Sequence, residues 1–140
     1  MVHLTNSHPR RTRKKKDQRV VLVIEDDASA SEMLTHFLER KNCRVATSEN
    51  GLIGLTMIKF LKPDVIITDL MIPGLDGRVL VERIRENIYM KGKMVVVVSG
   101  MFTERYNGER IHDIDADAVF SKPVNLARLH AAIERYYAKG

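Results

Sequence analysis

Hydrophobic residues in this chain alternate between short continuous runs and longer stretches with a helical repeat. Continuous or nearly continuous runs lie at residues 20–24, 44–47, 65–68, 94–98 and 116–120. Helical repeats begin near residue 28 and recur at 52–61, 77–90, 103–111 and from Asn125 onward. A short apolar run between turn residues is typical of a strand buried on both faces, whereas apolar residues three and four apart predict an amphipathic helix.

Strands and helices therefore alternate five times, which predicts an α/β protein with a (βα)5 pattern. Such a chain forms a doubly wound parallel sheet with helices on both faces, and the flavodoxin-like strand order 2-1-3-4-5 suits five units. The repeat at 103–111 is the weakest, because Asn107-Gly108 interrupts it. With 140 residues and 44% hydrophobic residues, a single domain from residue 20 to residue 140 is expected.

The charge of the chain is concentrated at its beginning. Residues 1–19 hold seven Lys and Arg against Asp17 and carry +6, whereas residues 20–140 carry −1. Without apolar periodicity, residues 1–19 are expected to be a disordered, solvated basic tail. Residues 10–19 could contact nucleic-acid phosphates weakly, or the tail could only keep the protein in solution. Both interpretations stay open.

The apolar segments are all too short to cross a bilayer, and the first residues lack the apolar stretch of a secretory signal. We therefore expect a cytoplasmic protein without membrane contact. The single cysteine, Cys43, cannot form an internal disulfide and is interpreted as a small apolar residue after the first helix.

Polar residues follow the ends of four predicted strands: Asp26 and Asp27, then Asp69, Ser99 and Lys122. In this topology the carboxyl ends of the strands meet at one crevice. Three carboxylates gathered there repel one another unless they take up protons or bind a cation, and oxygen ligands in small number favour Mg²⁺. Asp27 and Asp69 are then the expected direct ligands, with Asp26 acting through water.

The same residues suggest phosphoryl chemistry. With Mg²⁺ bound, Asp69 could attack a phosphoryl group, while Lys122 supplies a positive charge and the Ser99 hydroxyl donates to a phosphoryl oxygen. Each residue alone also has a structural interpretation, as a helix cap, a turn or a loop residue. Their joint occurrence at successive strand ends favours function.

These motifs resemble the response-regulator receiver domain of two-component signalling. The resemblance runs from about Val20 to the end of the chain and rests on Asp26-Asp27, the sequence DLMIPGLDG from Asp69, Ser99-Gly100 and Lys122-Pro123. It implies that a histidine kinase or phosphotransfer protein phosphorylates Asp69, with Mg²⁺ held by the acid pair, Asp69 and the Met71 carbonyl. It also implies a signalling protein rather than an enzyme, with at most self-phosphorylation from small donors and self-dephosphorylation.

The chain departs from the family pattern at Val119, where an aromatic residue usually turns inward during the switch. The neighbouring Phe120 should point to the opposite face of the strand and join the core. Since no output domain follows within these residues, output through contact with an unidentified downstream protein is expected. The expected surface is the fourth helix, fifth strand and fifth helix, with these candidate contacts: Tyr106, His112, His130, Tyr136 and Tyr137.

A second hypothesis is a protein-binding module that works without phosphorylation, through the retained acidic pocket or the basic tail. A hydrolase that uses Asp69 as nucleophile is disfavoured, because Met71 occupies the position two residues on where a proton-donating acid is needed.

Overall fold

The computed structural model describes residues 18–100, 105–106, 109–110 and 114–139. Its centre is a five-stranded sheet in the order β2-β1-β3-β4-β7, in which all neighbouring strands are parallel. The predicted 2-1-3-4-5 order is confirmed, with β7 as the fifth strand of the sheet. The strands are β1 (Val20–Ile24), β2 (Arg44–Ser48), β3 (Val65–Asp69), β4 (Met94–Ser99) and β7 (Ala118–Ser121).

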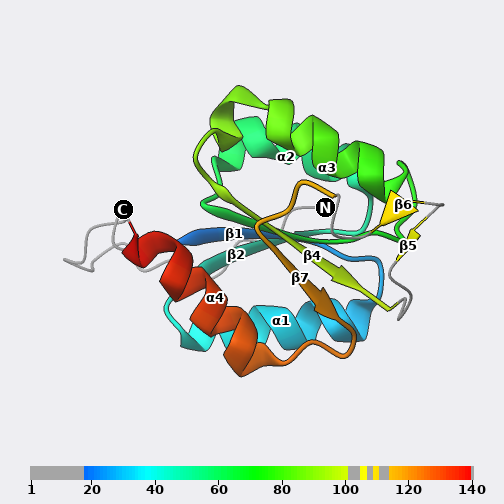
Figure 1. Ribbon diagram of the computed structural model, residues 1–140. Helices are drawn as coiled ribbons and strands as arrows, with labels where there is room; N and C mark the ends of the chain where they lie inside the picture. The colour runs from blue at the N-terminus through cyan, green and yellow to red at the C-terminus, as the bar shows by residue number, and fades with distance from the viewer. Residues whose placement is uncertain (1–17, 101–104, 107–108, 111–113, 140) are drawn as a thin grey trace.

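Helices cover both faces of this sheet, with α1 and α4 on one face and α2 and α3 on the other (Figure 1). The helices are α1 (Ala28–Arg40), α2 (Gly51–Leu61), α3 (Gly77–Glu86), the 3-10 helix η2 (Ile88–Met90) and α4 (Leu126–Ala138). Because each βαβ crossover is right-handed, helices placed on opposite faces follow from the strand order itself.

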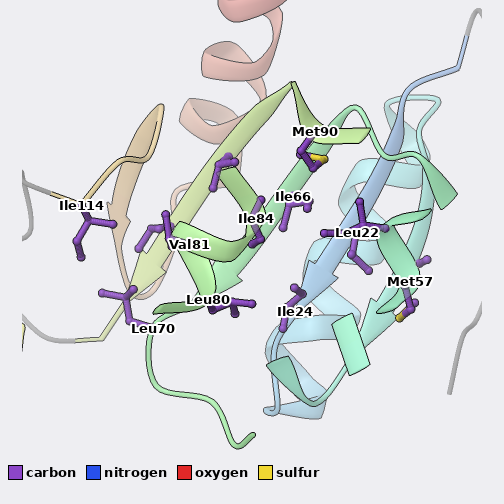
Figure 2. Close-up of a cluster of buried hydrophobic side chains, with 14 residues drawn as sticks. Leu22, Ile24, Met57, Ile66, Leu70, Leu80, Val81, Ile84, Met90 and Ile114 are labelled. Carbon is purple, nitrogen blue, oxygen red and sulfur yellow. The ribbon is translucent and has the colours of Figure 1, made fainter. Parts of the chain in front are cut away.

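Strand side chains alternate between two cores, which explains the continuous apolar runs in the sequence. Val95 and Val97 of β4 join the core under α2 and α3, part of which Figure 2 shows. Val96 and Val98 join the core under α1 and α4. Successive side chains of a strand point to opposite faces, so a strand covered on both sides needs apolar residues throughout.

The helix expected at 103–111 is wrong for the part of this segment that the structure describes. Arg105–Tyr106 and Glu109–Arg110 form an antiparallel pair, β5 and β6. The sequence between them, Asn107-Gly108, is the residue pair that two-residue hairpin turns favour. The described chain therefore has four α-helices beside its five parallel strands. Of the candidate contact residues, His112 and the Tyr106 side chain lie outside the described part.

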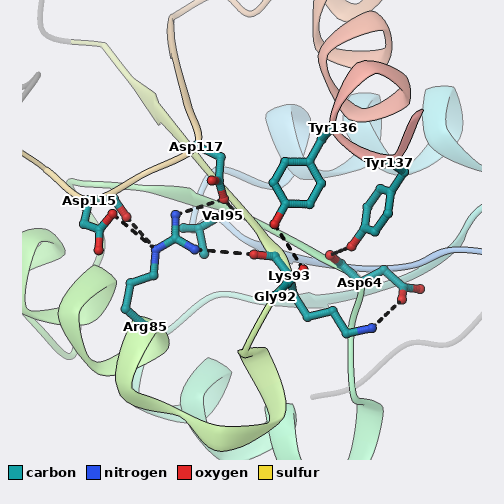
Figure 3. Close-up of polar contacts among 9 residues, drawn as sticks. All are labelled: Asp64, Arg85, Gly92, Lys93, Val95, Asp115, Asp117, Tyr136 and Tyr137. Atoms are coloured by element: carbon teal, nitrogen blue, oxygen red, sulfur yellow. Dashed lines mark hydrogen bonds and ion pairs between the residues drawn. The ribbon is translucent and has the colours of Figure 1, made fainter. Parts of the chain in front are cut away.

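At the amino end of the sheet, Arg85 of α3 connects three segments (Figure 3). Its Nε donates to the Asp115 carbonyl at 2.7 Å, and its Nη2 donates to Asp117 Oδ2 at 2.9 Å. The same Asp117 oxygen accepts from the Val95 backbone N–H at 2.8 Å. The chain leading into β7 is thereby held against α3 and the start of β4.

Two tyrosines of α4 bond to backbone carbonyls at the same end of the sheet (Figure 3). The Tyr136 hydroxyl donates to the Gly92 carbonyl at 3.1 Å, and the Tyr137 hydroxyl donates to the Asp64 carbonyl. Burial raises the pKa of the Tyr137 phenol, so it stays a donor. We call the following set the amino-end cluster: Asp64, Arg85, Lys93, Asp117, Tyr136 and Tyr137.

The predicted basic tail lies outside the described residues except for its last two. Arg19 directly precedes β1, pairs with Glu134 and lies over the Tyr137 ring at 4.9 Å. Arg19 therefore belongs to the folded part, although the sequence analysis counted it in the tail. No helix in the described ranges combines the length and the apolar character that a membrane span requires.

Candidate functional site

Three carboxylates meet where β1 and β3 end side by side. Ile24 pairs with Thr68, so Glu25 and Asp26 leave β1 next to Asp69, the last residue of β3. One carboxylate oxygen from each of Glu25, Asp26 and Asp69 lies within 4.8 Å of the others. We call these three residues the acid cluster.

Asp69 is held in place through both carboxylate oxygens although it is only 6% exposed. Oδ1 accepts from the Met71 backbone N–H at 2.9 Å, and Oδ2 accepts from Lys122 Nζ at 2.5 Å. The residues that follow, 71–76, form a partly exposed loop beside this buried carboxylate. A buried anion with fixed orientation is suited to a reaction at its oxygen atoms.

Lys122 joins two members of the acid cluster. Besides Asp69, its Nζ contacts Glu25 Oε1 at 2.8 Å. Burial lowers the pKa of the Lys122 ammonium, but its hydrogen bonds to Asp69 and Glu25 outweigh that effect and raise the pKa overall. The Lys122 backbone N–H donates to the Ser99 carbonyl at 2.8 Å, which fixes the start of the β7–α4 connection beside β4. Lys122 therefore stays charged at neutral pH.

Glu25 is a member of the cluster that the sequence analysis missed. It is 4% exposed, and its Oε2 accepts from the Asp27 backbone N–H at 3.1 Å. Burial raises the pKa of its carboxyl group, and the nearby Asp69 charge acts in the same direction. The signal was present, since three acids in a row follow Ile24 and the first of them lies nearest the strand end.

Asp27, predicted as a direct metal ligand, has another role in the structure. It is the N-cap of α1, where its Oδ1 accepts from the Ser29 and Ala30 backbone N–H groups at 2.9 and 3.3 Å. Its side chain is exposed and lies outside the acid cluster. Two residues apart along this turn, Glu25 enters the crevice and Asp27 caps the helix.

The two remaining candidates lie on either side of Asp69. Ser99 ends β4, is 2% exposed and pairs in register with Ser121 of β7. Met71 follows Asp69 by two residues, with its side chain 58% exposed and its backbone turned so that the N–H meets Asp69. The structure thus gathers Asp26, Asp69 and Lys122 as expected, with Ser99 at the end of the adjacent strand.

The donor set of the acid cluster suits a hard divalent cation. Three carboxylates face one ammonium, so the group keeps a net charge of −2 when the acids are ionised. Carboxylate and carbonyl oxygens are the ligands that Mg²⁺ prefers, and Mg²⁺ needs few of them from protein. The residues present therefore fit the metal that the fold family implies.

Val119, at the switch position, and its neighbour Phe120 lie on opposite faces of β7. Val119 is 40% exposed on the face that it shares with Val97, whereas Phe120 is partly buried and packs against the core under α1 and α4. Phe120 thus lies on the opposite face of β7 from Val119, as predicted. Position 119, where the family usually has the switching aromatic residue, holds a valine.

A groove leads away from the acid cluster along α1. Glu25 and Lys122 line its polar end, and Met33, Leu34 and Val124 line its apolar part. Met33 also borders a second hollow beside Phe37 and Leu126. The acid cluster is thus continuous with an apolar surface between α1 and the β7–α4 connection.

Comparison with known sequences agrees with this geometry. The family model for the response regulator receiver domain matches residues 21–134. The transcriptional regulatory protein CseB of Streptomyces coelicolor is 31% identical over 131 residues, which cover 86% of this chain and 51% of that protein. The DNA-binding response regulator MtrA of Mycobacterium tuberculosis is 42% identical over 57 residues, covering 41% and 25%. The chain spans about half the length of CseB.

Solved structures share the fold. The chemotaxis response regulator CheY4 of Vibrio cholerae superposes with a TM-score of 0.75 at 24% identity, covering 85% of this chain and 98% of that one. The receiver domain of a sensor histidine kinase from Pseudomonas aeruginosa gives 0.77 at 18% identity over 86% and 98%, and that protein has a magnesium ion in its active site cleft. Because the family model matches most of its length, this chain belongs to the response regulator receiver domain family of two-component signalling.

Proposed function

We propose that Asp69 accepts a phosphoryl group from a phosphohistidine carried by a histidine kinase or phosphotransfer protein. The observation that carries this proposal is the position of Lys122, whose Nζ lies 2.5 Å from Asp69 Oδ2 and 2.8 Å from Glu25 Oε1. A carboxylate held beside an ammonium at the mouth of a groove can receive a phosphoryl group whose oxygens need a cation.

The transfer itself is a displacement at phosphorus. An Asp69 carboxylate oxygen forms the new O–P bond as the P–N bond to the donor imidazole breaks. The electron pair of that bond returns to the imidazole, which leaves neutral because its other nitrogen carries the proton. Lys122 then exchanges part of its contact with Asp69 for the phosphoryl oxygens, which keeps the added charge paired. The result is an aspartyl phosphate on the receiver.

Mg²⁺ would be held by Glu25, Asp26, Asp69 and the Met71 carbonyl. When bound, it offsets the negative charge of the acceptor and of the incoming phosphoryl oxygens. Glu25 takes the place that the sequence analysis gave to Asp27, because Glu25 lies in the acid cluster and Asp27 caps α1. The net charge of the cluster supports this assignment.

The apolar groove beside the acid cluster supports an approach of the donor along α1. Met33, with 57% of its surface exposed, lies where the groove meets the second hollow. A donor that buries this surface would bring its phosphohistidine to the polar end at Lys122. Output then passes through changed contacts with a downstream protein, for which the edge strand β7 and the last helix α4 offer the candidate surface. Action in the cytoplasm is part of the same proposal.

Mass measurement of the intact protein after incubation with acetyl phosphate and Mg²⁺ tests the proposal. We expect a gain of one phosphoryl group, loss of that gain in EDTA, and none in Asp69→Asn. Asp27→Asn is the matched control, because asparagine caps a helix as well as aspartate does. It should be phosphorylated like the wild type, whereas Asp26→Asn should not.

Absence of any gain in the wild-type protein would overturn the proposal and favour the binding module that works without phosphorylation. A gain that persists in Asp69→Asn would also overturn it, since another residue would then be the acceptor.

A further inference from the structure

The loop that follows Asp69 is anchored to the turn between β2 and α2. The Gly51 backbone N–H donates to the Pro73 carbonyl at 3.0 Å. Next to it, Gly74 lies so close to Asn50 that a Cβ on Gly74 would sit 2.5 Å from Asn50 Oδ1. Gly74 also has φ +100, a conformation that other residues rarely adopt. Turn and loop therefore fit together only because residue 74 has no side chain.

The loop is also fixed at both of its ends. At its start, the Met71 N–H donates to Asp69 Oδ1 at 2.9 Å. At its end, Gly77 packs directly on the Leu70 backbone, which a Cβ at residue 77 would overlap. The Met71 carbonyl lies between the contact to Asp69 and the contact at Pro73, so its position depends on both.

The β2–α2 turn is itself rigidly held. Asn50 Oδ1 accepts from the Leu52 and Ile53 N–H groups at 2.8 and 3.1 Å and caps α2. Ser48 Oγ donates to the Asn50 carbonyl at 2.8 Å. The Ser48 carbonyl accepts from the Glu25 N–H at 2.9 Å, so this same turn also fixes the backbone of the acid cluster.

We propose that the turn at residues 48–51 positions the Mg²⁺ site. The hydrogen bond from the Gly51 N–H to the Pro73 carbonyl holds the loop so that the Met71 carbonyl faces Glu25 and Asp26. The turn contacts both halves of the site: the β1 end through Ser48 and the loop through Gly51 and Asn50. In this proposal Gly51 is not a metal ligand, and it acts only by positioning the loop that carries Met71. This inference rests on the proposed function.

A proline at residue 51 removes this donor and places its Cδ where the N–H hydrogen pointed, so the Pro73 carbonyl must move away from the turn. Gly51 is the first residue of α2, where proline is well tolerated because its N–H is not needed by the helix. The preceding residue, Asn50, is already extended with φ −136 and ψ 136, as a residue before proline requires. Gly51→Ala is the matched control, since its Cβ would meet no atom closer than 3.4 Å and its N–H remains.

We expect Gly51→Pro to weaken Mg²⁺ binding about tenfold, as loss of a group that orients a metal ligand commonly does. Gly51→Ala should bind like the wild type. Binding is measured without any phosphodonor, from backbone amide shifts of Asp26 and Met71 during Mg²⁺ titration. Phosphorylation by acetyl phosphate at saturating Mg²⁺ should return to the wild-type rate, because positioning affects the metal rather than Asp69.

A second pair of variants decides the matter if Gly51→Pro does not fold. Both Gly74→Ala and Gly92→Ala place an alanine where the backbone has a positive φ, +100 and +77. Only the Cβ at residue 74 would meet Asn50, because nothing lies within 4 Å of a Cβ at residue 92. Weaker Mg²⁺ binding in Gly74→Ala than in Gly92→Ala supports the inference. Equal Mg²⁺ affinity within either pair overturns it while the wild type still binds Mg²⁺. A wild type that binds no Mg²⁺ contradicts the proposed function instead.

Discussion

Lys122 at the carboxyl end of the sheet faces three carboxylates, whereas the cations at the amino end each have carboxylate partners of their own. Arg85 pairs with Asp117 at 2.9 Å, and Lys93 pairs with Asp64 at 3.2 Å. The amino-end cluster also binds backbone carbonyls through its two tyrosines. The charges of these side chains are therefore balanced at the amino end of the sheet, whereas the carboxyl end keeps a net negative charge.

The difference indicates what each end contributes. Paired charges and satisfied backbone groups hold α3, α4 and the chain before β7 against the sheet. Excess negative charge in a crevice lowers stability until a cation binds, a common cost of functional sites. Breaking the amino end should therefore destabilise the fold, and neutralising the carboxyl end should stabilise it while abolishing phosphorylation.

The largest loss of stability is expected from Asp117→Ala. It leaves the Val95 N–H and the Arg85 guanidinium without their shared acceptor, which should lower the free energy of unfolding by about 3 kcal/mol. Asp115→Ala is the control, because that side chain is 79% exposed and 3.7 Å from Arg85. Its loss should be ~0.5 kcal/mol or less. Urea unfolding measures both, and equal losses would contradict the role given to Asp117.

Mg²⁺ should stabilise the wild type by about 2.7 kcal/mol at a free concentration ~100 times its dissociation constant. Asp26→Asn should lose this stabilisation, and in EDTA it should be more stable than the wild type by about 1 kcal/mol because one repelling charge is gone. Asp27→Asn should keep the full effect of Mg²⁺. Urea unfolding with and without Mg²⁺ provides the measurement. A Mg²⁺ effect that disappears in Asp27→Asn would restore the assignment made from sequence.

A smaller effect is expected from pH. Because the pKa of Glu25 is raised in the folded protein, its folded form takes up a proton at higher pH than its unfolded form. The resulting stabilisation is complete below the ordinary value of 4.5 and is lost as pH rises through the raised pKa. In EDTA, the stability of the wild type relative to Glu25→Gln should therefore increase as pH falls from 7 toward 4.5. A flat difference would show that Glu25 does not titrate there.

The smallest effect is expected from chemical modification of Cys43. This residue is 4% exposed and lies just before β2, at the amino end of the sheet. Burial raises the pKa of its thiol to about 11, so little thiolate exists at neutral pH. Iodoacetamide should modify the folded protein far more slowly than the urea-unfolded chain, as followed by mass spectrometry. The rate should not change when Asp69 is phosphorylated. Rapid modification of the folded protein would mean that the amino end opens more readily than its contacts suggest.

Sequence was sufficient for the sheet because its central strands need apolar residues on both faces. The run at 94–98 could only be a strand covered on two sides, and the strand order followed from connection rules. The structure gathers Glu25 and Asp26, one residue earlier than the predicted pair, because periodicity does not locate a strand end that closely. Whether Asp27 or Glu25 enters the crevice depends on where α1 begins, and the cap at Asp27 decides it.

The charge pairs at the amino end of the sheet had no usable signal in the sequence. Arg85 lies 30 and 32 residues before its partners Asp115 and Asp117, and Asp64 lies 29 residues before Lys93. Single charges between apolar runs are normally exposed. Only the assembled sheet brings them together. In the described part of 103–111 the expected helix is replaced by a strand pair, because the hairpin preference of Asn107-Gly108 outweighs a weak helical repeat.

The hydroxyls of Tyr136 and Tyr137 donate to main-chain carbonyls rather than to side chains, and these bonds attach the last turn of α4 to the amino end of the sheet. Main-chain carbonyls are the same whatever residues stand at 64 and 92, so the attachment tolerates change in its partners. A fluorophore or a fused protein joined after Lys139 would consequently report movement of the whole helix relative to the sheet, and not the fraying of a loose end.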